Sequence, residues 1–330
     1  MNAGSDWPSS RALLKAKARC QNPTGNRRDF RRIEVGWVRE FMRVISWNIQ
    51  AGGGNRKAKL VDAVIARKPD VVTFQEVTPG SVDSFRELFR ATELAHFTDS
   101  FPRCNAGKLT GCRSYGELIA SRWPLEQIAS TSFGAPWAEK VLSVNLESPH
   151  GRVELHSVHL PNGSSNGWTK IEMFEAIYKK LARNVNHHRI LCGDFNSPIQ
   201  EMADGQIRTC GQITLGSDGR YIICESWTDK QGRTFPEERW DMAERQVLQG
   251  LRRYDLSDVF RAKHRYGHEE FSYYIYNRGR RIGRRFDHIF ASHLLEVVEC
   301  EYLHDLREVQ KLSDHAPIEA LFAPKAPIRI

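Results

Sequence analysis

The sequence predicts an α/β or α+β fold built around a mixed β-sheet, because three features occur together. From residue 43 onward, short apolar runs of strand length alternate with amphipathic segments of helical spacing. An Asp-Gly pair at 218 and 219 lies between two apolar runs, 213–215 and 221–223, and predicts a hairpin. No linker divides residues 42–325 and no internal repeat is visible, so we expect one domain there.

Eight apolar runs are predicted as strands from their length and their content of β-branched residues. They are Val44–Trp47, Val71–Phe74, Leu118–Ala120, Val141–Leu146, Val153–Val158, Ile190–Cys192, Phe286–Phe290 and Ile318–Phe322. Apolar residues at helical spacing predict the helices Ala58–Ala66, Val82–Phe89, Lys170–Leu181 and Arg239–Leu251. We expect Asp255 or Ser257 to cap the helix that follows.

Residues 1–41 are predicted to form a basic, disordered tail. The first 40 residues contain nine Lys or Arg against four acidic residues, which accounts for five of the eight net positive charges. Global basicity is therefore weak evidence for a polyanionic partner. Met42 stands directly before the first predicted strand, which suggests it as an alternative start of the protein. Intact residues 1–41 in protein from the native source would exclude that start.

Composition excludes two classes of protein. No apolar run approaches the 18 residues that a bilayer-spanning helix requires, so we expect no membrane partner. The seven cysteines are odd in number and include no C-x-x-C pair, so neither a disulfide framework nor a zinc ribbon is indicated. We expect a cytoplasmic monomer in a reducing compartment.

Polar residues able to carry out catalysis stand repeatedly at the ends of the predicted strands, where folds of this class build their sites. Each has a plain structural reading. Asp194 could form only an Asx-turn, Asp314 could be a cap, and Asp287 could pair with Arg284 or Arg285. The joint occurrence of six such positions favours a functional site. The positions are Asn48, Gln75-Glu76, His159, Asp194 with Asn196, Asp287-His288 and Asp314-His315.

Five separated segments resemble the motifs of the endonuclease/exonuclease/phosphatase superfamily, over residues 43–322. They are Trp47-Asn48-Ile49-Gln50, Gln75-Glu76-Val77, Gly193-Asp194-Phe195-Asn196, Arg284-Arg285-Phe286-Asp287-His288-Ile289 and Ser313-Asp314-His315-Ala316-Pro317. The resemblance implies a four-layer sandwich, in which two mixed β-sheets pack face to face with helices on the outside. It also implies divalent-metal-dependent hydrolysis of phosphoester bonds.

Phosphodiester hydrolysis depends on positioning and on electrostatic stabilisation of the developing charge, so it requires hard oxygen ligands for a cation. Glu76 and Asp314, together with Asn48, are suited to hold one Mg²⁺ or Mn²⁺. The resemblance implies the same ligand role for them.

Proton transfer requires a base for the attacking water and a donor for the phosphate. Asp194 is suited to accept the proton, with Asn196 orienting the water or donating to a phosphate oxygen. His315 can place a donor against the phosphate, while Asp287 fixes its tautomer. These roles match the superfamily's residue by residue.

Further segments resemble the exonuclease III and abasic-site endonuclease branch. Tyr115 resembles the tyrosine that contacts the scissile phosphate in that branch, and Asn162 resembles the asparagine whose amide contacts phosphate. Gln50 and Glu117 depart from the branch pattern. His159 is part of a His-Leu pair similar to the motif of phosphodiesterase and deoxyribonuclease relatives. A phosphate-contacting His159 with Tyr115 outside the site would indicate a broader phosphodiesterase.

An arginine run lies directly before Asp287, beside several tyrosines. Such a patch can neutralise nucleic-acid phosphates while aromatic rings stack on exposed bases, although a solvated loop is the alternative. We expect Arg280, Arg281 and Arg284 to bind substrate phosphates. The run and its neighbours comprise Arg278, Arg280, Arg281, Arg284, Arg285, Tyr273, Tyr274 and Tyr276.

The sequence thus predicts a metal-dependent phosphodiester hydrolase acting on DNA at abasic sites or 3′ ends. Two alternatives stay open. One is a phosphatase or phosphodiesterase for small or lipid-borne phosphoesters, favoured by His159, by Gln50 and by the modest charge of the domain. The other is a binding module that keeps the fold without catalysis, which loss of the catalytic carboxylates or histidine would mark.

Overall fold

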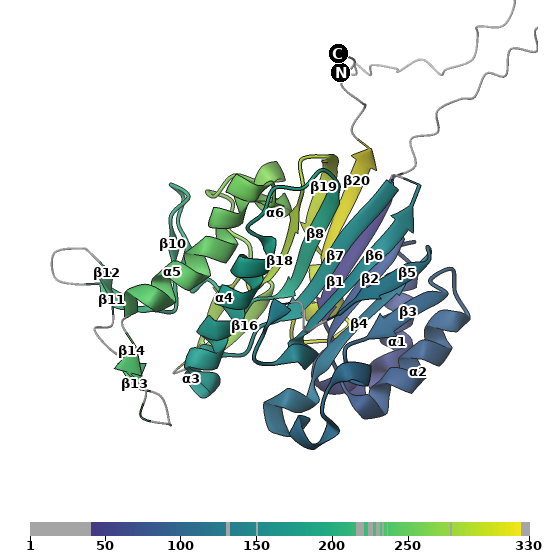
Figure 1. Cartoon of the computed structure of the whole chain (residues 1–330), viewed down its shortest axis with the longest axis horizontal. Coiled ribbons are helices and arrows are strands. Elements are labelled where there is room, and N and C mark those ends of the chain that lie inside the picture. The colour runs from purple at the N-terminus through teal and green to yellow at the C-terminus, as the bar shows by residue number, and fades with distance from the viewer. Residues whose placement is uncertain are drawn as a thin grey trace, which may run out of the picture. The chain divides into compact units, whose positions relative to one another are not determined.

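The computed structural model describes residues 41–129, 133–149, 151–215, 221–223, 227–228, 232, 234–235, 237–277 and 279–324. Two six-stranded mixed sheets pack face to face, and helices cover both outer faces (Figure 1). In this view α1 (Lys57–Ile65) and α2 (Pro79–Arg90) cover one face, while α4 (Trp168–Leu181) and α5 (Glu237–Leu248) cover the other. This arrangement confirms the predicted four-layer α/β sandwich.

The first six-stranded sheet, sheet A, contains the ends of the domain, and the second, sheet B, contains its middle. Sheet A has the order β19 (Leu295–Tyr302), β20 (Ile318–Pro324), β1 (Met42–Asn48), β2 (Val71–Val77), β4 (Gly116–Ser121) and β3 (His96–Asp99). Sheet B has the order β15 (Ser257–Asp258), β18 (Asp287–Ala291), β8 (His188–Asp194), β7 (Gly151–His159), β6 (Val141–Ser148) and β5 (Leu125–Ile128). All eight predicted strands are present.

Shorter elements connect the sheets. Four two-stranded ribbons are β9 (Gln200–Glu201) with β10 (Ile207–Arg208), β11 (Gln212–Leu215) with β12 (Tyr221–Ile223), β13 (Trp227–Thr228) with β14 (Thr234–Phe235), and β16 (Tyr273–Asn277) with β17 (Arg280–Arg284). The remaining α-helices are α3 (Gly163–Asn166), α6 (Val259–Lys263) and α7 (His304–Glu308). The 3₁₀ helices are η1 (Ala51–Arg56), η2 (Phe101–Arg103), η3 (Ala106–Lys108), η4 (Gly111–Ser114), η6 (Ala138–Lys140) and η7 (Gly250–Tyr254).

The register of the central strands brings the polar strand ends together. In sheet A, β1 runs parallel to β2, and Asn48 lies opposite Gln75. In sheet B, β7 runs parallel to β8, and His159 lies opposite Asp194. The antiparallel strand β18 begins at Asp287, which lies on the other side of Asp194. Because these residues occupy matching ends of neighbouring strands, both sheets present them at one edge of the sandwich.

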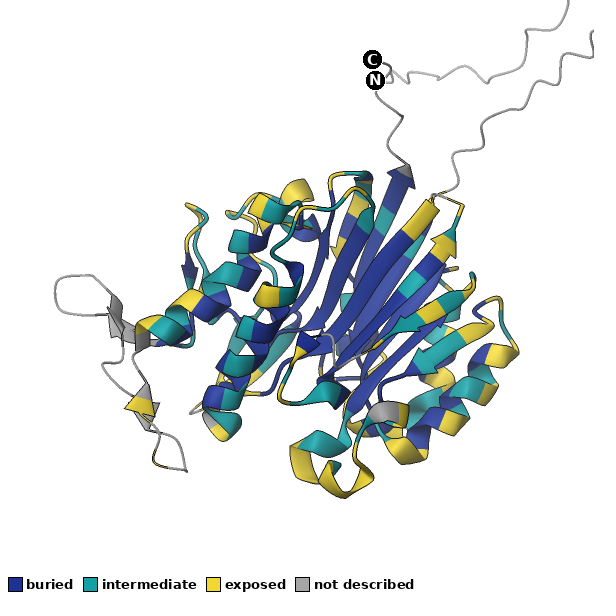
Figure 2. Ribbon diagram, in the orientation of Figure 1, coloured by how far each residue is buried: buried dark blue, intermediate teal, exposed yellow. Residues whose placement is uncertain are grey.

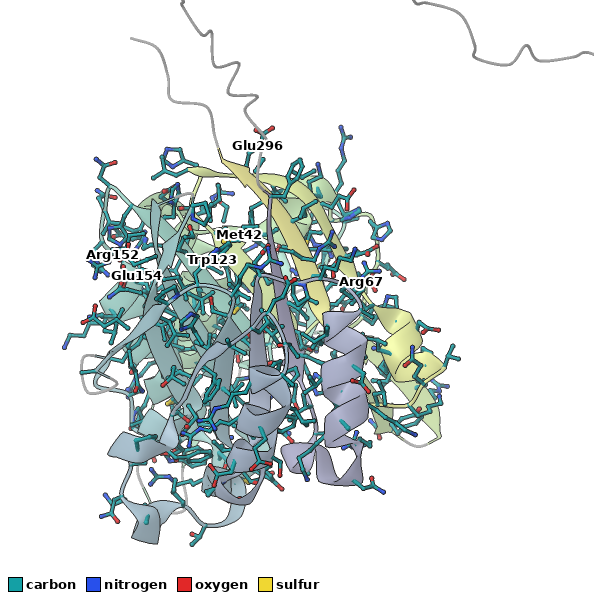
Figure 3. The ribbon with its side chains drawn as sticks, turned by 90° about the vertical axis from the view of Figure 1, so that its right-hand side faces the viewer. Met42, Arg67, Trp123, Arg152, Glu154 and Glu296 are labelled. Atoms are coloured by element: carbon teal, nitrogen blue, oxygen red, sulfur yellow. The ribbon has the colours of Figure 1, made fainter. Side chains whose placement is uncertain are left out.

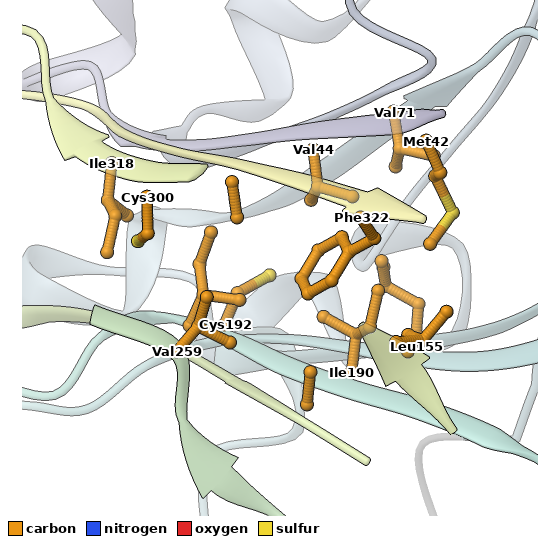
Figure 4. Close-up of a cluster of buried hydrophobic side chains, with 14 of the residues drawn as sticks. Met42, Val44, Val71, Leu155, Ile190, Cys192, Val259, Cys300, Ile318 and Phe322 are labelled. Carbon is orange, nitrogen blue, oxygen red and sulfur yellow. The ribbon is translucent and has the colours of Figure 1, made fainter. Parts of the chain in front are cut away.

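Apolar side chains from both sheets fill the space between them. Figure 4 shows Val44 and Phe322 of sheet A facing Leu155 and Ile190 of sheet B, and all four are fully buried. Burial of an aliphatic or aromatic side chain of this size contributes about 1.5–3 kcal/mol. This shared core fixes the two sheets relative to one another, and with them the edge that carries the polar residues.

The outer faces of the sheets are apolar as well, because each is covered by helices. On β1, Val44 points to the inner core, whereas Ile45 and Trp47 belong to the cluster beneath α1 and α2. Central strands covered on both faces are therefore almost continuously buried, as the dark strands of Figure 2 show, while the helices expose their outer surfaces. This double coverage explains why the strands read as apolar runs rather than as alternating patterns.

Two local predictions need correction. The helix predicted over Arg239–Leu251 ends at Leu248, and the separate 3₁₀ helix η7 follows it. The next helix, α6, is capped by Asp258, whose side chain accepts a hydrogen bond from the backbone N–H of Arg261, and not by Asp255 or Ser257. The hairpin prediction is confirmed in its two strands, which pair antiparallel, while the Asp-Gly turn lies outside the described residues.

The first described strand, β1, begins at Met42, the first residue of the predicted domain. Met42 and Trp123, labelled in Figure 3, mark the end of the sandwich opposite the polar strand ends. The tail predicted over residues 1–41 lies, apart from Phe41, outside the described residues. Across the part of the chain that the structure describes, no helix is long and apolar enough to cross a bilayer.

Candidate active site

A cavity of about 740 Å³ opens at the edge of the sandwich that collects the polar strand ends. We call it the cleft. Nine of the predicted site residues line it: Glu76, Tyr115, His159, Asn162, Asp194, Asn196, Arg284, Asp314 and His315. Asn48 and Asp287 lie directly behind this lining and contact it through hydrogen bonds. Residues from both sheets therefore converge on one space.

Asp194 is the buried centre of the site. Its Oδ2 accepts a hydrogen bond from Nδ2 of Asn48 at 3.0 Å, and its Oδ1 accepts one from the backbone N–H of Asn196 at 2.8 Å. Burial is the main influence on this carboxyl and raises the pKa of Asp194 to about 7. The bond from the backbone of Asn196 to Oδ1 forms the Asx-turn that the sequence offered as the structural role of Asp194. This turn uses Oδ1 and leaves Oδ2 facing the cleft.

The backbone before and after Asp194 is specified by sequence. Gly193 has a φ of +136°, and a Cβ there would lie 1.9 Å from the carbonyl oxygen of Val158 on the neighbouring strand. Only glycine permits this close approach of β7 to β8. Asn196 has a left-handed φ of 49°, a conformation that asparagine tolerates better than most residues. Its Nδ2 donates to the carbonyl oxygen of Leu160, the residue that follows β7, at 2.9 Å.

His315 is held from several directions. Its Nδ1 lies 2.7 Å from Oδ2 of Asp287, and its ring stacks on Tyr273 with 4.5 Å between ring centroids. Burial disfavours the charged imidazole, but the Asp287 carboxylate outweighs it and raises the pKa of His315 to about 10. Nε2 of His315 is left 3.8 Å from Oδ2 of Asp194. The site therefore contains a charged donor beside a buried carboxylate.

His159 occupies the opposite side of Asp194. Its Nε2 lies 3.8 Å from Oδ2 of Asp194 and 3.8 Å from Oε1 of Glu76. Its Nδ1 contacts the Nζ of Lys140 at 3.0 Å. Burial is the main cause that holds the pKa of His159 well below its usual value, and the positive charges of Lys140 and His315 add to it. At neutral pH the ring of His159 is therefore neutral, whereas the ring of His315 carries a positive charge.

The predicted metal ligands supply the donor set that a hard cation prefers. Glu76 keeps 22% of its side chain exposed and Asp314 is exposed, and both carboxylates line the cleft. Glu76 has a left-handed φ of 66°, a strained conformation that the backbone N–H of Ala51 supports by donating to its Oε2 at 2.6 Å. These oxygens fit Mg²⁺ or Mn²⁺, which would be held by Glu76 and Asp314.

Asn48 bridges the two halves of the site. Its Nδ2 donates to Glu76 at 3.2 Å as well as to Asp194, and its Oδ1 accepts from the backbone N–H of Gln50 at 3.0 Å. In this arrangement Asn48 aligns the two carboxylates. A direct ligand role for Asn48 stays a prediction.

Asp194, Asp287 and His315 form the one cluster of three potential metal-ligating side chains that the described ranges contain, with ligand atoms within 4.8 Å of one another. We interpret this cluster as a proton-transfer group, because Nδ1 of His315 is engaged by Asp287 and a charged imidazole repels a cation. The alternative in which Asp287 pairs with Arg285 is wrong. Arg285 is buried and pairs with Glu201 and Asp258.

The two residues that distinguish the branches lie in the same space. Tyr115 and His159 both line the cleft, so the condition that would have indicated a broader phosphodiesterase, Tyr115 outside the site, is not met. Tyr115 is half-buried, and the Nζ of Lys140 lies 5.6 Å from its ring centroid. Asn162 is exposed at the rim of the cleft.

The arginine run is divided by the hairpin of β16 and β17. Arg284 lines the cleft, whereas Arg280 and Arg281 line a neighbouring hollow. Arg281 forms an ion pair with Glu308, and its guanidinium lies 3.5 Å from the ring centroid of Tyr274. The structure therefore brings only one of the three predicted arginines to the cleft. Arg284 is the last residue of β17 and also lines the neighbouring hollow, so it lies where the two spaces meet.

Sequence reasoning missed two lysines at the site. Lys140 contacts His159, and Lys170 donates to the carbonyl oxygen of Asn196 at 2.8 Å and pairs with Glu244 at 3.1 Å. Both lysines are almost completely buried. A lone lysine before an apolar strand, or on a helix, carries no local signal of such a contact.

Comparisons with known proteins agree with the fold and the motifs. Residues 45–315 match the model of the endonuclease/exonuclease/phosphatase family. Exodeoxyribonuclease III of Haemophilus influenzae is 26% identical over 295 residues, which cover 85% of this chain and all of that protein.

Solved structures show the same fold. An AP endonuclease from Archaeoglobus fulgidus superposes with a TM-score of 0.58 at 19% identity, covering 85% of this chain and 99% of its own. D. rerio TDP2 complexed with single strand DNA product gives a TM-score of 0.56 at 14% identity. The match covers 86% of this chain and 98% of the TDP2 chain. With a family match over most of the chain and the motif residues gathered in one cleft, this protein belongs to the endonuclease/exonuclease/phosphatase family and is an enzyme that hydrolyses phosphodiester bonds.

Proposed function

We propose that the protein is a divalent-metal-dependent DNA nuclease that acts at abasic sites or 3′ ends. The observation that carries this proposal is the convergence of one buried carboxylate, two histidines and two open carboxylates on a single cleft. The similarity to exodeoxyribonuclease III over the full length of that protein supports DNA as the substrate.

The residues of the chain divide the chemistry among them. Asp194 is placed to accept the proton of an attacking water, with the Asn196 amide beside it. His315, held by Asp287, presents its Nε2–H to a phosphate oxygen whose charge develops in the transition state. Mg²⁺ or Mn²⁺ held by Glu76 and Asp314 supplies positive charge to the phosphate and the leaving oxygen when bound.

The rim of the cleft supports a polynucleotide substrate. Arg284 can neutralise a phosphate next to the scissile one, and the exposed Asn162 can donate to another. Tyr273 lines the cleft, with its ring stacked on His315 and on Phe286. Tyr115 completes the wall beside Lys140.

The test compares three substrates: a duplex with one abasic site, a duplex with a recessed 3′ end, and bis(nitrophenyl) phosphate. Each is assayed with Mg²⁺ and with a chelator, using wild type and Asp194→Asn as the matched inactive control. We expect DNA cleavage that far exceeds hydrolysis of the small diester, requires Mg²⁺ and disappears in the variant.

A second candidate is a phosphodiesterase with broader substrates, which the presence of His159 in the lining of the cleft favours. It predicts hydrolysis of the small diester at a rate comparable with the DNA substrates. That result would contradict the proposal that DNA is the dedicated substrate. Cleavage that persists in Asp194→Asn would contradict the assignment of the site itself.

A further inference from the structure

A buried lysine stands behind His159 and has no part in the chemistry described so far. Lys140 ends the 3₁₀ helix η6, directly before β6, and only 2% of its surface is exposed. Its Nζ lies 3.0 Å from Nδ1 of His159. A lysine is almost never this buried unless a partner compensates for the lost hydration, so its position needs an explanation.

The contact fixes the proton of the imidazole. An ammonium group carries three donors and no acceptor, so Nδ1 of His159 must be the acceptor in its bond with Lys140. The proton of the neutral ring is then on Nε2, which faces Asp194 and Glu76 at 3.8 Å each. We propose that Lys140 is a positioning residue that holds His159 in the Nε2–H tautomer and so presents a neutral N–H donor to the phosphate in the cleft.

The surroundings of Lys140 are consistent with an ammonium at this depth. Burial is the main cause that lowers the pKa of Lys140, while Glu117 and Glu76 act in the opposite direction. Burial also raises the pKa of Glu117 to about 8, so at neutral pH Glu76 is the more fully charged of these two partners. Glu117 is fully buried on β4, the position that departs from the branch pattern in the sequence. The ring of Tyr115 adds a favourable face to the cation at 5.6 Å.

His159 and His315 therefore each have an Nδ1 partner, and the two partners carry opposite charges. A carboxylate, Asp287, engages Nδ1 of His315 and favours the imidazolium, whereas an ammonium, Lys140, engages Nδ1 of His159 and excludes it. The cleft thus gains two N–H donors beside Asp194, one from a charged imidazole and one from a neutral imidazole. This inference rests on the proposed function in treating the cleft as a phosphate site.

The first test is Lys140→Met, which keeps the length of the side chain and removes the donor. A purely structural lysine can be replaced in this way without kinetic effect, because apolar replacement of a buried charge is often neutral or stabilising. We expect kcat on the DNA substrate to fall by about 10- to 100-fold, with a smaller change in KM and an unchanged or higher Tm. Lys179→Met, at an exposed lysine of α4, is the matched control.

Two measurements separate positioning from other roles. Nitrogen-15 NMR of histidine-labelled wild type, with the His159 signals identified by their absence in His159→Ala, should show an unprotonated Nδ1 and a protonated Nε2. In a double-mutant cycle, Lys140→Met should have little further effect on kcat in the His159→Ala background, because Lys140 acts through that ring.

Protonated Nδ1 in wild type, or full kcat in Lys140→Met, would overturn the inference. An additional loss of kcat from Lys140→Met in the His159→Ala background would overturn it as well. The NMR measurement needs no substrate, so it stands even if wild type fails to cleave DNA. That failure would count against the proposed function alone.

Discussion

Asp287 and His315 come from different sheets and meet through a hydrogen bond of 2.7 Å between Oδ2 and Nδ1. Asp287 is the first residue of β18 in sheet B, and His315 precedes β20 in sheet A. Tyr302 and Ser272 hold the backbone of Asp287 through its carbonyl oxygen and its N–H. The charge state of His315 therefore depends on the packing of one sheet on the other.

Replacing Asp287 with Asn should lower kcat by about 10- to 100-fold and also lower the Tm, because the buried His315 loses its charged partner. The amide oxygen can still accept from Nδ1, but it no longer stabilises the charged imidazole. Steady-state kinetics with a thermal unfolding scan checks this expectation. A kcat close to that of wild type would mean that His315 acts without its charge.

Asp194→Asn should cost on the order of 10²-fold or more in kcat, because it removes the proton acceptor. The variant has the same shape and keeps an oxygen for the backbone N–H of Asn196, so the fold should be retained. Circular dichroism and kcat measured on one preparation test both statements. Near-normal turnover would defeat the assignment of Asp194.

Glu76→Gln should raise the Mg²⁺ concentration needed for half-maximal activity, because it removes one of the two open carboxylates of the cleft. The amide can still accept from the backbone N–H of Ala51, so the strained loop should persist. Titration of activity with Mg²⁺ after treatment with a chelator measures the shift. Unchanged dependence on Mg²⁺ would place the cation elsewhere.

Arg284→Ala should reduce the slope of log binding affinity against log salt by about 1, since one phosphate contact is lost. Arg281→Ala is the internal comparison, because Arg281 is already paired with Glu308 outside the cleft. Fluorescence anisotropy with labelled DNA at several salt concentrations gives both slopes. Equal slopes for wild type and Arg284→Ala would remove Arg284 from the interface.

Glu201→Gln should destabilise the protein by an amount that depends on pH. Burial opposes ionisation of this carboxyl, but its pairs with Arg285 at 2.5 Å and Arg261 at 2.7 Å lower the pKa of Glu201 to about 2. In the unfolded chain the Glu201 carboxylate binds a proton more readily than in the folded protein. The stabilisation that Glu201 gives the folded state is therefore complete above about pH 4.5 and is lost as the pH falls toward 2.

At neutral pH, Glu201→Gln should lower the free energy of unfolding by about 3 kcal/mol relative to wild type. This difference in the free energy of unfolding should become smaller in acid. Urea unfolding between pH 3 and pH 7 measures this gap. Glu175→Gln is the control, because its pair with Arg239 is more exposed and should be worth about 0–1 kcal/mol. A gap independent of pH would show that Glu201 acts through packing.

Hydrophobic periodicity and the polar residues at strand ends predict most of the site from the sequence. Apolar runs predicted the central strands, and Asn48, Glu76, His159 and Asp194 follow them directly in the chain. Register then places these residues at one edge, because matching ends of parallel strands meet there. The tail, the oligomeric state and the cellular location stay predictions.

The sequence by itself determined most of the strands and helices and the residue types of the cleft, since hydrophobic periodicity and glycine at 193 are local properties of the chain. The four-layer arrangement is implied by the family resemblance. Only the tertiary structure decided which charged side chains reach that cleft. Arg284 lines it whereas Arg281 does not, and Lys140 meets His159 across 19 residues of chain. Long charged side chains take their direction from the packing of distant elements, and no local pattern encodes that packing.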